Sequence, residues 1–299
     1  HPNTPPTVLE WCRDRLLPSV RHRLRREFGW ECFDYGNTER VDGQRAWATF
    51  GEEARYATNY SGLRGCAGLL SEAVSFRPFP FRIATTGAWM ETVLSETLRN
   101  PESLRAARLS STRPTRLGVR FALDTAGHAV IPLEDPARAI ADPSRAPEAW
   151  TAERLPVFDR WKPVRTSSVP DAWLIPPTAG DTLGLLRRHG VRIERLNKPW
   201  TGTVERFRIS DMVRANRFQG RQLIRLEGRF ETARTEIPAG TFAVPFDQPL
   251  GRLAFTLLEP ESLDGVAAWG FLENQIAPGG WFPIAKSMPT PGDAPIPVG

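Results

Sequence analysis

One carboxylate in a glycine-rich, largely uncharged stretch is the first candidate for chemistry. The stretch runs from Tyr60 to Phe76, and from Leu63 to Leu70 every residue except Arg64 is apolar or small. This composition predicts a strand that is buried on both faces and ends near Glu72. Ligands of α/β proteins bind beyond the carboxyl ends of strands, so Glu72 is a candidate catalytic group. A structural ion pair with one of the many arginines is the alternative interpretation.

Side chains on the face of Glu72 are the expected substrate contacts. Alternate residues of an extended strand share one face. Besides Glu72, that face would hold Leu70, Gly68, Cys66 and Arg64. The glycine and the cysteine leave room for a substrate side chain, and a guanidinium matches a carboxylate with two hydrogen bonds. A structural pair with Glu52 or Glu53 explains Arg64 equally well. Tyr60 completes the expected set.

Three blocks of this sequence, in order, resemble the zinc metallocarboxypeptidases, and more closely their bacterial branch with a β-rich C-terminal extension. The blocks are FDYGN (33–37), then TNYSGLR, LLSEA and FRPF (58–64, 69–73, 76–79), then DQPLGRL and LEPES (247–253, 258–262). The resemblance implies a peptide substrate, hydrolysis of its C-terminal amide bond, and Glu72 as general base. The related branch has a second arginine just after Arg64, where this chain has Gly65 and Cys66.

The resemblance also implies zinc, held by a His-x-x-Glu pair and a more distant histidine. None of the four histidines has a glutamate three residues later; they are His1, His22, His128 and His189. His1 lies 71 residues before Glu72, near the spacing of the third ligand, but it precedes a helix rather than ending a strand. We therefore expect no metal site within this chain and zinc ligands upstream of it. The chain is expected to be an incomplete copy that is inactive on its own.

Charge and hydropathy exclude two classes of partner. The net charge is +5, from 39 basic and 34 acidic residues, and the arginines are scattered along the chain. Nucleic acid is therefore not an expected partner. No run approaches the ~20 apolar residues that span a bilayer, so we expect no membrane span. Three cysteines are too few for a disulfide framework, and export stays open.

The expected fold class is α/β, a partial carboxypeptidase-like mixed sheet with flanking helices, followed by a β-rich α+β accessory domain. The expected boundaries are 1–100 for the catalytic part, 101–112 for a linker and 113–299 for the accessory domain. Thr7 and Glu10 form a capping-box pattern, Pro18 should kink the helix that follows, and Gly29 should end it. A second amphipathic helix is expected over 82–99, with Ile83, Met90, Leu94 and Leu98 on one face.

Strands dominate the expected accessory domain. A strand at 117–123 should turn at 124–127, residues 134–170 read as irregular, and the tail from residue 277 as poorly ordered. A βαβ-like unit is expected from 173–175, 181–189 and 191–196, and hairpins over 203–246 precede a short helix at 250–258. The competing function is a non-catalytic module that binds peptide or cell-wall material through its tryptophans. These are Trp150, Trp161, Trp173 and Trp200.

Overall fold

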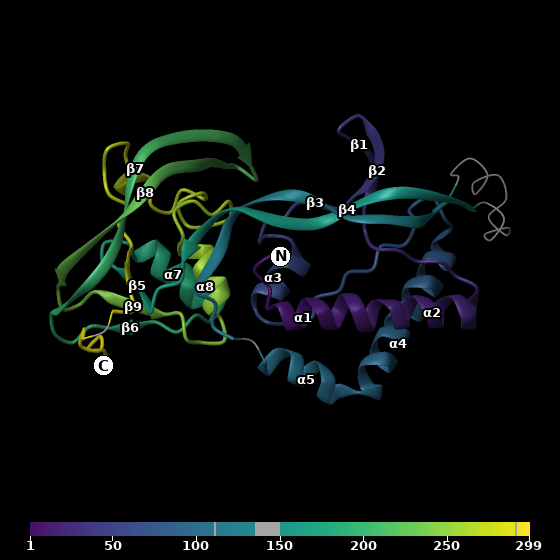
Figure 1. The fold of residues 1–299 in the computed structure, drawn as a ribbon, viewed down its shortest axis with the longest axis horizontal. Helices are drawn as coiled ribbons and strands as arrows, with labels where there is room; N and C mark the ends of the chain where they lie inside the picture. The colour runs from purple at the N-terminus through teal and green to yellow at the C-terminus, as the bar shows by residue number, and fades with distance from the viewer. Residues whose placement is uncertain (111, 135–149, 291) are drawn as a thin grey trace.

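The computed structural model describes residues 1–110, 112–134, 150–290 and 292–299, and it is a mixed α/β fold with two sheets and several helices (Figure 1). The helical elements are α1 (Pro6–Glu10), η1 (Trp11–Leu16), α2 (Leu17–Phe28), α3 (Ala57–Leu63), α4 (Phe79–Arg99), α5 (Pro101–Leu109), α7 (Gly180–His189), α8 (Gly251–Leu258) and η3 (Glu273–Gln275). Most of the expected linker is therefore helical, because α5 occupies it.

Within the described residues, ten strands form the two sheets. They are β1 (Asn37–Val41), β2 (Gln44–Ala48), β3 (Arg116–Glu134), β4 (Trp150–Ser168), β5 (Ala172–Ile175), β6 (Glu194–Arg195), β7 (Trp200–Phe218), β8 (Arg221–Ile237), β9 (Phe242–Pro245) and β10 (Ala285–Ser287). The four-stranded sheet has the order β1-β2-β4-β3, and the six-stranded sheet has the order β6-β9-β5-β10-β7-β8. The antiparallel β3–β4 pair forms a long arm that reaches over α1 and α2 (Figure 1).

The βαβ-like prediction is confirmed. Both β5 and β6 pair antiparallel with β9, so the two are parallel to each other, and α7 connects them. The helix ends as the sequence predicts, at Gly190, whose φ of 80° is left-handed and therefore suits glycine. The strand predicted at 191–196 is shorter, since only Glu194 and Arg195 pair with β9.

The first helix runs through α1, η1 and α2 without a break. A π-helical segment, η1, directly precedes the region of Pro18, which has no backbone N–H to donate. The predicted end at Gly29 is confirmed, with a φ of 68°. The predicted capping box is wrong, because the Thr7 hydroxyl instead donates to the carbonyl oxygen of Ala107 in α5, at 2.5 Å.

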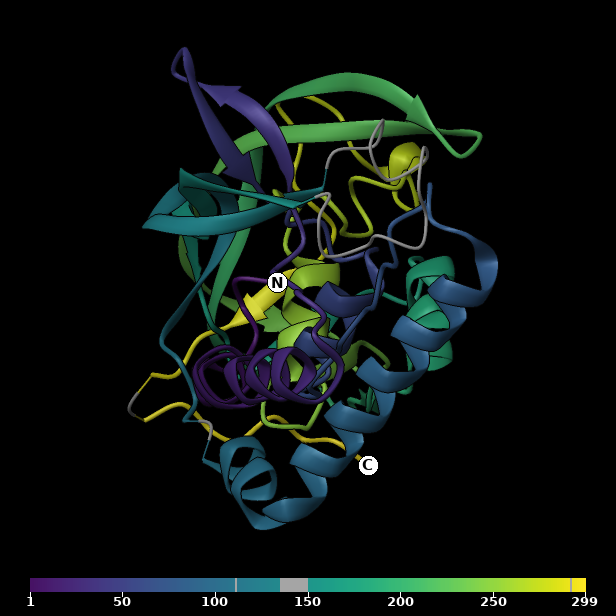
Figure 2. The same cartoon turned by 90° about the vertical axis from the view of Figure 1, so that its right-hand side faces the viewer.

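Two apolar clusters hold the helices in place. Residues of η1 and α2 pack against α4 around Trp11, Leu24 and Ala88. Figure 2 looks nearly along α2 (purple) and shows α4 (blue) crossing beside it. By contrast, α3 contributes Leu63 to the large core between the six-stranded sheet, α7 and α8, where Phe255 is also buried. Thus α3 is attached to the C-terminal part of the chain.

The predicted amphipathic helix exists as α4, but its apolar face points outward. Ile83, Met90, Leu94 and Leu98 share one face, and each is more than half exposed. The buried face of α4 holds Ala88 and Thr92 instead. Periodicity identified the apolar stripe correctly but did not identify which face the neighbouring helices cover.

Three predictions for the C-terminal region are wrong. Residues 150–168 form β4 rather than an irregular connection, and residues 135–149 lie outside the described residues. The turn expected at 124–127 is absent because β3 passes through this region with bulges while remaining paired with β4. The tail expected to be poorly ordered contains β10, which lies between β5 and β7.

Candidate functional site

The stretch that carries Glu72 is extended but belongs to neither sheet. Helix α3 ends at Leu63, and the chain turns at Gly65, whose φ is 69°. Residues 66–74 then run without a helix, turn or bend. The prediction of a strand buried on both faces is wrong, because among the described residues no strand lies beside this segment and no backbone hydrogen bond involves residues 67–73.

One face of this extended segment is covered and the other is open. Ala67 and Leu69 pack against the cluster formed by η1, α2 and α4. Leu70, at 63% exposure, Glu72 and Val74 are exposed. Alternation with a period of two is the pattern of an extended chain with one covered face. Leu70 and Glu72 therefore share a face, as the sequence predicted, but that face is open.

Glycines let the extended segment lie close to α3. A Cβ atom on Gly68 would overlap the side chain of Ser61, and one on Gly62 would overlap the Thr4 hydroxyl. Gly68 thus permits close packing, and its expected contact with a substrate stays a prediction. The Cys66 thiol lies 3.7 Å from the carbonyl oxygen of Arg64.

A groove of about 1580 Å³ runs along this segment. Its walls come from η1 and α2, from residues 66–74, from the N-terminal half of α4 and from the end of the β3–β4 arm. Among the residues predicted to form the site, it is lined by Cys66, Gly68, Leu70 and Glu72. His1 and aromatic residues also line it, among them Trp30, Tyr35, Phe50, Tyr56, Phe81 and Trp89.

Tyr60 and Arg64 lie outside the groove lining and contact His189 instead. The Arg64 guanidinium donates to the Tyr60 hydroxyl and to the His189 carbonyl oxygen, both at 3.0 Å. The Tyr60 hydroxyl lies 2.9 Å from Nδ1 of His189. Burial, and then the positive charges of Arg64 and Arg188, lowers the pKa of the His189 imidazole. The substrate contacts expected for Tyr60 and Arg64 stay predictions. The alternative ion pair of Arg64 with Glu52 or Glu53 is not formed among the described contacts.

Most charged side chains of the groove are paired with a neighbouring charge. The pairs are Arg21–Asp34, Arg25–Glu31 and Arg160–Asp159. Among the described residues, two charged side chains of the lining have no ion pair or side-chain hydrogen bond, namely Glu72 on the extended segment and Arg13 on η1. Burial, more than the nearby charge of Arg160, lowers the pKa of the Arg13 guanidinium. No sequence motif points to Arg13.

The described residues do not fit a zinc site. No group of three or more His, Cys, Asp or Glu side chains lies close enough to hold a metal within the described ranges. His1 accepts a hydrogen bond at Nδ1 from the Asn3 amide, at 3.0 Å, and its ring packs edge-on against Phe121. All three cysteines are free, and burial raises the pKa of the Cys12 and Cys32 thiols to about 11. Those two thiols are therefore neutral near pH 7 and are poor metal ligands or nucleophiles.

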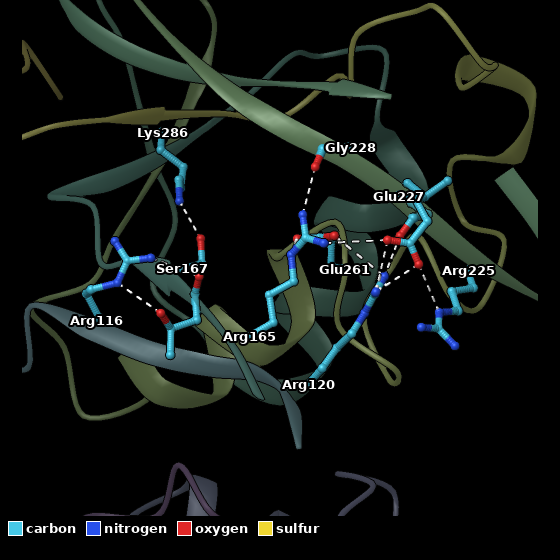
Figure 3. Close-up of polar contacts among 11 residues, drawn as sticks. Arg116, Arg120, Arg165, Ser167, Arg225, Glu227, Gly228, Glu261 and Lys286 are labelled. Atoms are coloured by element: carbon cyan, nitrogen blue, oxygen red, sulfur yellow. Dashed lines mark hydrogen bonds and ion pairs between the residues drawn. The ribbon is translucent and has the colours of Figure 1, made fainter. Parts of the chain in front are cut away.

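The LEPES block forms a buried network of charges rather than an open site (Figure 3). Lys286 is 2% exposed, and its ammonium group lies 2.8 Å from the Ser167 hydroxyl and 3.5 Å from a Glu259 carboxylate oxygen. Glu261 pairs with Arg165 at 2.8 Å, and burial raises its pKa to about 7. The network ties the β3–β4 arm to the six-stranded sheet, so these acids have a structural role.

The DQPLGRL block is also structural. A Cβ atom on Gly251 would overlap the carbonyl oxygen of Phe246, so glycine is required at the start of α8. The Gln248 side chain accepts from the Arg192 amide and donates to the Pro245 carbonyl oxygen, both at 2.7 Å. These contacts fix the turn between β9 and α8.

The predicted tryptophan surface is largely internal. Trp173 and Trp200 are 1% and 6% exposed, and both are part of the cores. Trp161 is half-buried, and the side chain of Trp150 lies outside the described residues. The part of the chain that the structure describes also has no helix long and apolar enough to cross a bilayer.

Comparison with known proteins gives partial matches. The chain is 31% identical over 126 residues to Carboxypeptidase 2 of Trichophyton rubrum, which covers 42% of this chain and 23% of that protein. It is 30% identical over 124 residues to Carboxypeptidase 2 of Trichophyton tonsurans, which covers 41% and 23%. The similarity is to carboxypeptidases. The match spans less than a quarter of the length of these relatives. No family model matches, and no solved structure matches.

Proposed function

We propose that this chain supplies part of the active site of a carboxypeptidase-type peptidase, with Glu72 as its general base. The distant similarity to carboxypeptidases supports a peptidase-related function. The observation that carries the assignment of Glu72 is its position, exposed in a large groove and without a charged partner among the described residues. A carboxylate that no arginine neutralises is available to accept a proton.

In this proposal, Glu72 takes a proton from the attacking water and later gives it to the departing amine. The groove walls would hold the peptide, with Leu70 beside the carboxylate and Cys66 and Gly68 along the same segment. The expected cofactor is zinc, which lowers the pKa of bound water and polarises a carbonyl group. The described residues do not fit such a site, so we propose that the ligands belong to polypeptide beyond them.

Substitution of Glu72 tests its role. In the full-length parent protein, Glu72→Gln should reduce kcat by roughly 10²–10⁴-fold and leave peptide binding nearly unchanged. Glu102→Gln, at the exposed start of α5, is the matched control and should retain full turnover. Substantial turnover by the Glu72 variant would remove this residue from the mechanism.

Metal analysis of residues 1–299 tests the second part of the proposal. Equilibrium dialysis followed by elemental analysis should find no tightly bound zinc on this chain. A stoichiometry of one zinc per chain would show that the ligands lie within it.

The proposal also assigns residues 1–100 to the catalytic part and residues 113–299 to an accessory domain.

A further inference from the structure

The extended segment 66–74 presents an unpaired polypeptide edge to the groove. Among the described residues, no backbone hydrogen bond involves the amides and carbonyls of residues 67–73. Backbone polar groups in extended conformation bind a second extended chain readily. The side chains beside this edge, Leu70 and Val74, are apolar and exposed. An aqueous groove leaves both the edge and these side chains in contact with water.

The described part of the groove lining also contains an arginine without an ion pair, Arg13. Arg13 is half-buried on η1, and within the described residues no carboxylate lies at ion-pair distance from it. The nearby acids on the other elements already have partners, since Asp34 pairs with Arg21 and Asp159 with Arg160. Asp14, the neighbouring acid on η1, is exposed. A partly desolvated guanidinium without a partner gains most from a carboxylate, which it binds through two hydrogen bonds.

We propose that the groove binds an extended polypeptide segment bearing an acidic side chain, whose backbone pairs with residues 67–73 and whose carboxylate pairs with Arg13. The unpaired edge requires an extended chain, and the charge of Arg13 selects an acidic one. Both features line the same groove, and Ala67 and Leu69 pack against the cluster that contains Trp11, two positions before Arg13. The proposal concerns the same groove in which the proposed function places its peptide, so it rests on polypeptide binding there but not on catalysis by Glu72.

Binding of two matched peptides tests the charge selection. The probes are short, fluorescently labelled, end-blocked peptides of alternating valine and threonine with a central glutamate or a central glutamine. The glutamate peptide should bind at least about tenfold more tightly, which corresponds to 1.4 kcal/mol. Arg13→Gln should abolish this difference, whereas Arg15→Gln, an exposed neighbour on η1, should preserve it.

Equal binding of the two peptides, or a preference that survives Arg13→Gln, would overturn the assignment of Arg13. Absence of binding by either peptide would overturn the proposal as a whole. Since the peptides are blocked at both ends and the readout is binding, these outcomes do not depend on turnover. Loss of catalysis in Glu72→Gln therefore remains a separate result.

Hydrogen exchange tests the backbone pairing. Saturation with the glutamate peptide should slow exchange at about every second amide in residues 67–73, because alternate residues of a strand face the same neighbour. Unchanged exchange across 67–73 during binding would exclude strand pairing. Sedimentation of the free protein tests whether a second copy of this chain occupies the groove instead. A dimer in which the amides of residues 67–73 are already protected from hydrogen exchange would assign the groove to that second copy and overturn the proposal.

Discussion

The hydroxyl of Tyr60 lies 2.9 Å from Nδ1 of His189, which joins α3 to the C-terminal end of α7. The same hydroxyl accepts a hydrogen bond from Arg64, at 3.0 Å. The donor in the Tyr60–His189 bond is set by the imidazole tautomer: when Nδ1 is unprotonated, the Tyr60 hydroxyl donates to it while accepting from the guanidinium. The three side chains thus form a polar contact between segments that are 129 positions apart.

Tyr60→Phe should lower the free energy of unfolding by about 1 kcal/mol, because it removes a partly buried hydrogen bond and leaves Nδ1 of His189 without its partner. Urea denaturation measures this change. Tyr35→Phe is the control, since Tyr35 is exposed and its hydroxyl has no hydrogen bond among the described residues. Equal effects of the two substitutions would show that the Tyr60–His189 bond contributes nothing to stability.

Acid should destabilise the protein through His189. Its pKa is lowered in the fold from the usual 6.5, so the unfolded chain binds a proton more readily than the folded one. The stabilising effect is complete above pH 6.5 and is lost as the pH falls toward the lowered pKa. Urea titrations between pH 5 and pH 8 should therefore show a steeper decline for the wild type than for His189→Gln.

Wild type must be compared with the His189→Gln variant because Glu261 changes the free energy of unfolding with pH in the opposite direction. Its pKa is raised from 4.5 to about 7, so its contribution favours the folded state at low pH and is lost as the pH rises through 7. That contribution is common to both proteins and cancels in the difference. Identical pH dependences would contradict the neutral imidazole of His189.

Gly251→Ala should cost at least 1–3 kcal/mol, because the added methyl group would overlap the carbonyl oxygen of Phe246. Gly184→Ala in the middle of α7 is the matched control. The nearest atom to its added methyl group would be the Arg188 guanidinium nitrogen, at 3.6 Å. This control should stabilise the protein by about 0.5–1 kcal/mol through helix propensity. Chemical denaturation of both variants measures whether the free energy of unfolding falls for Gly251→Ala and rises for Gly184→Ala.

Leu94→Ala on the outer face of α4 should change stability by less than about 0.5 kcal/mol, since the side chain is 60% exposed. Leu24→Ala on α2 should cost about 2–5 kcal/mol, because Leu24 is buried in the cluster beneath α4. Thermal or urea unfolding measures both. A large cost for Leu94→Ala would mean that this face is covered in solution.

Local signals predicted the elements whose ends are determined by nearby residues. Gly29 and Gly190 end α2 and α7 as expected, and α8 follows the predicted range closely. Pairing between distant segments was not predictable in the same way. The prolines of β4 suggested an irregular connection, yet Pro163 pairs with Phe121 in β3. A proline is compatible with a strand where its missing N–H is not required for the ladder.

The candidate site was also predicted only in part, because contacts between distant segments are not visible in the local sequence. The sequence identified an extended, apolar stretch and the isolated acid Glu72, but whether both faces are covered depends on segments elsewhere in the fold. Arg64 was assigned to a substrate carboxylate from its place on the face of Glu72 and from its guanidinium, with a local glutamate pair as the alternative. Its contact with His189 spans 125 positions. Arg13 was missed because nothing in its local sequence distinguishes it from the other arginines. Its lack of an ion-pair partner among the described residues depends on the fold and not on its neighbours in the sequence.

The position of β10 has a practical consequence for anyone shortening this protein. Strand β10 (Ala285–Ser287) lies between β5 and β7 and is hydrogen-bonded to both. A stop codon introduced after residue 276, where proline and glycine suggest a dispensable tail, would split one continuous layer into two halves with newly opened edges. It would also delete Lys286 and leave Glu259 enclosed without its counter-charge. Insolubility of such a product would follow from the cut itself.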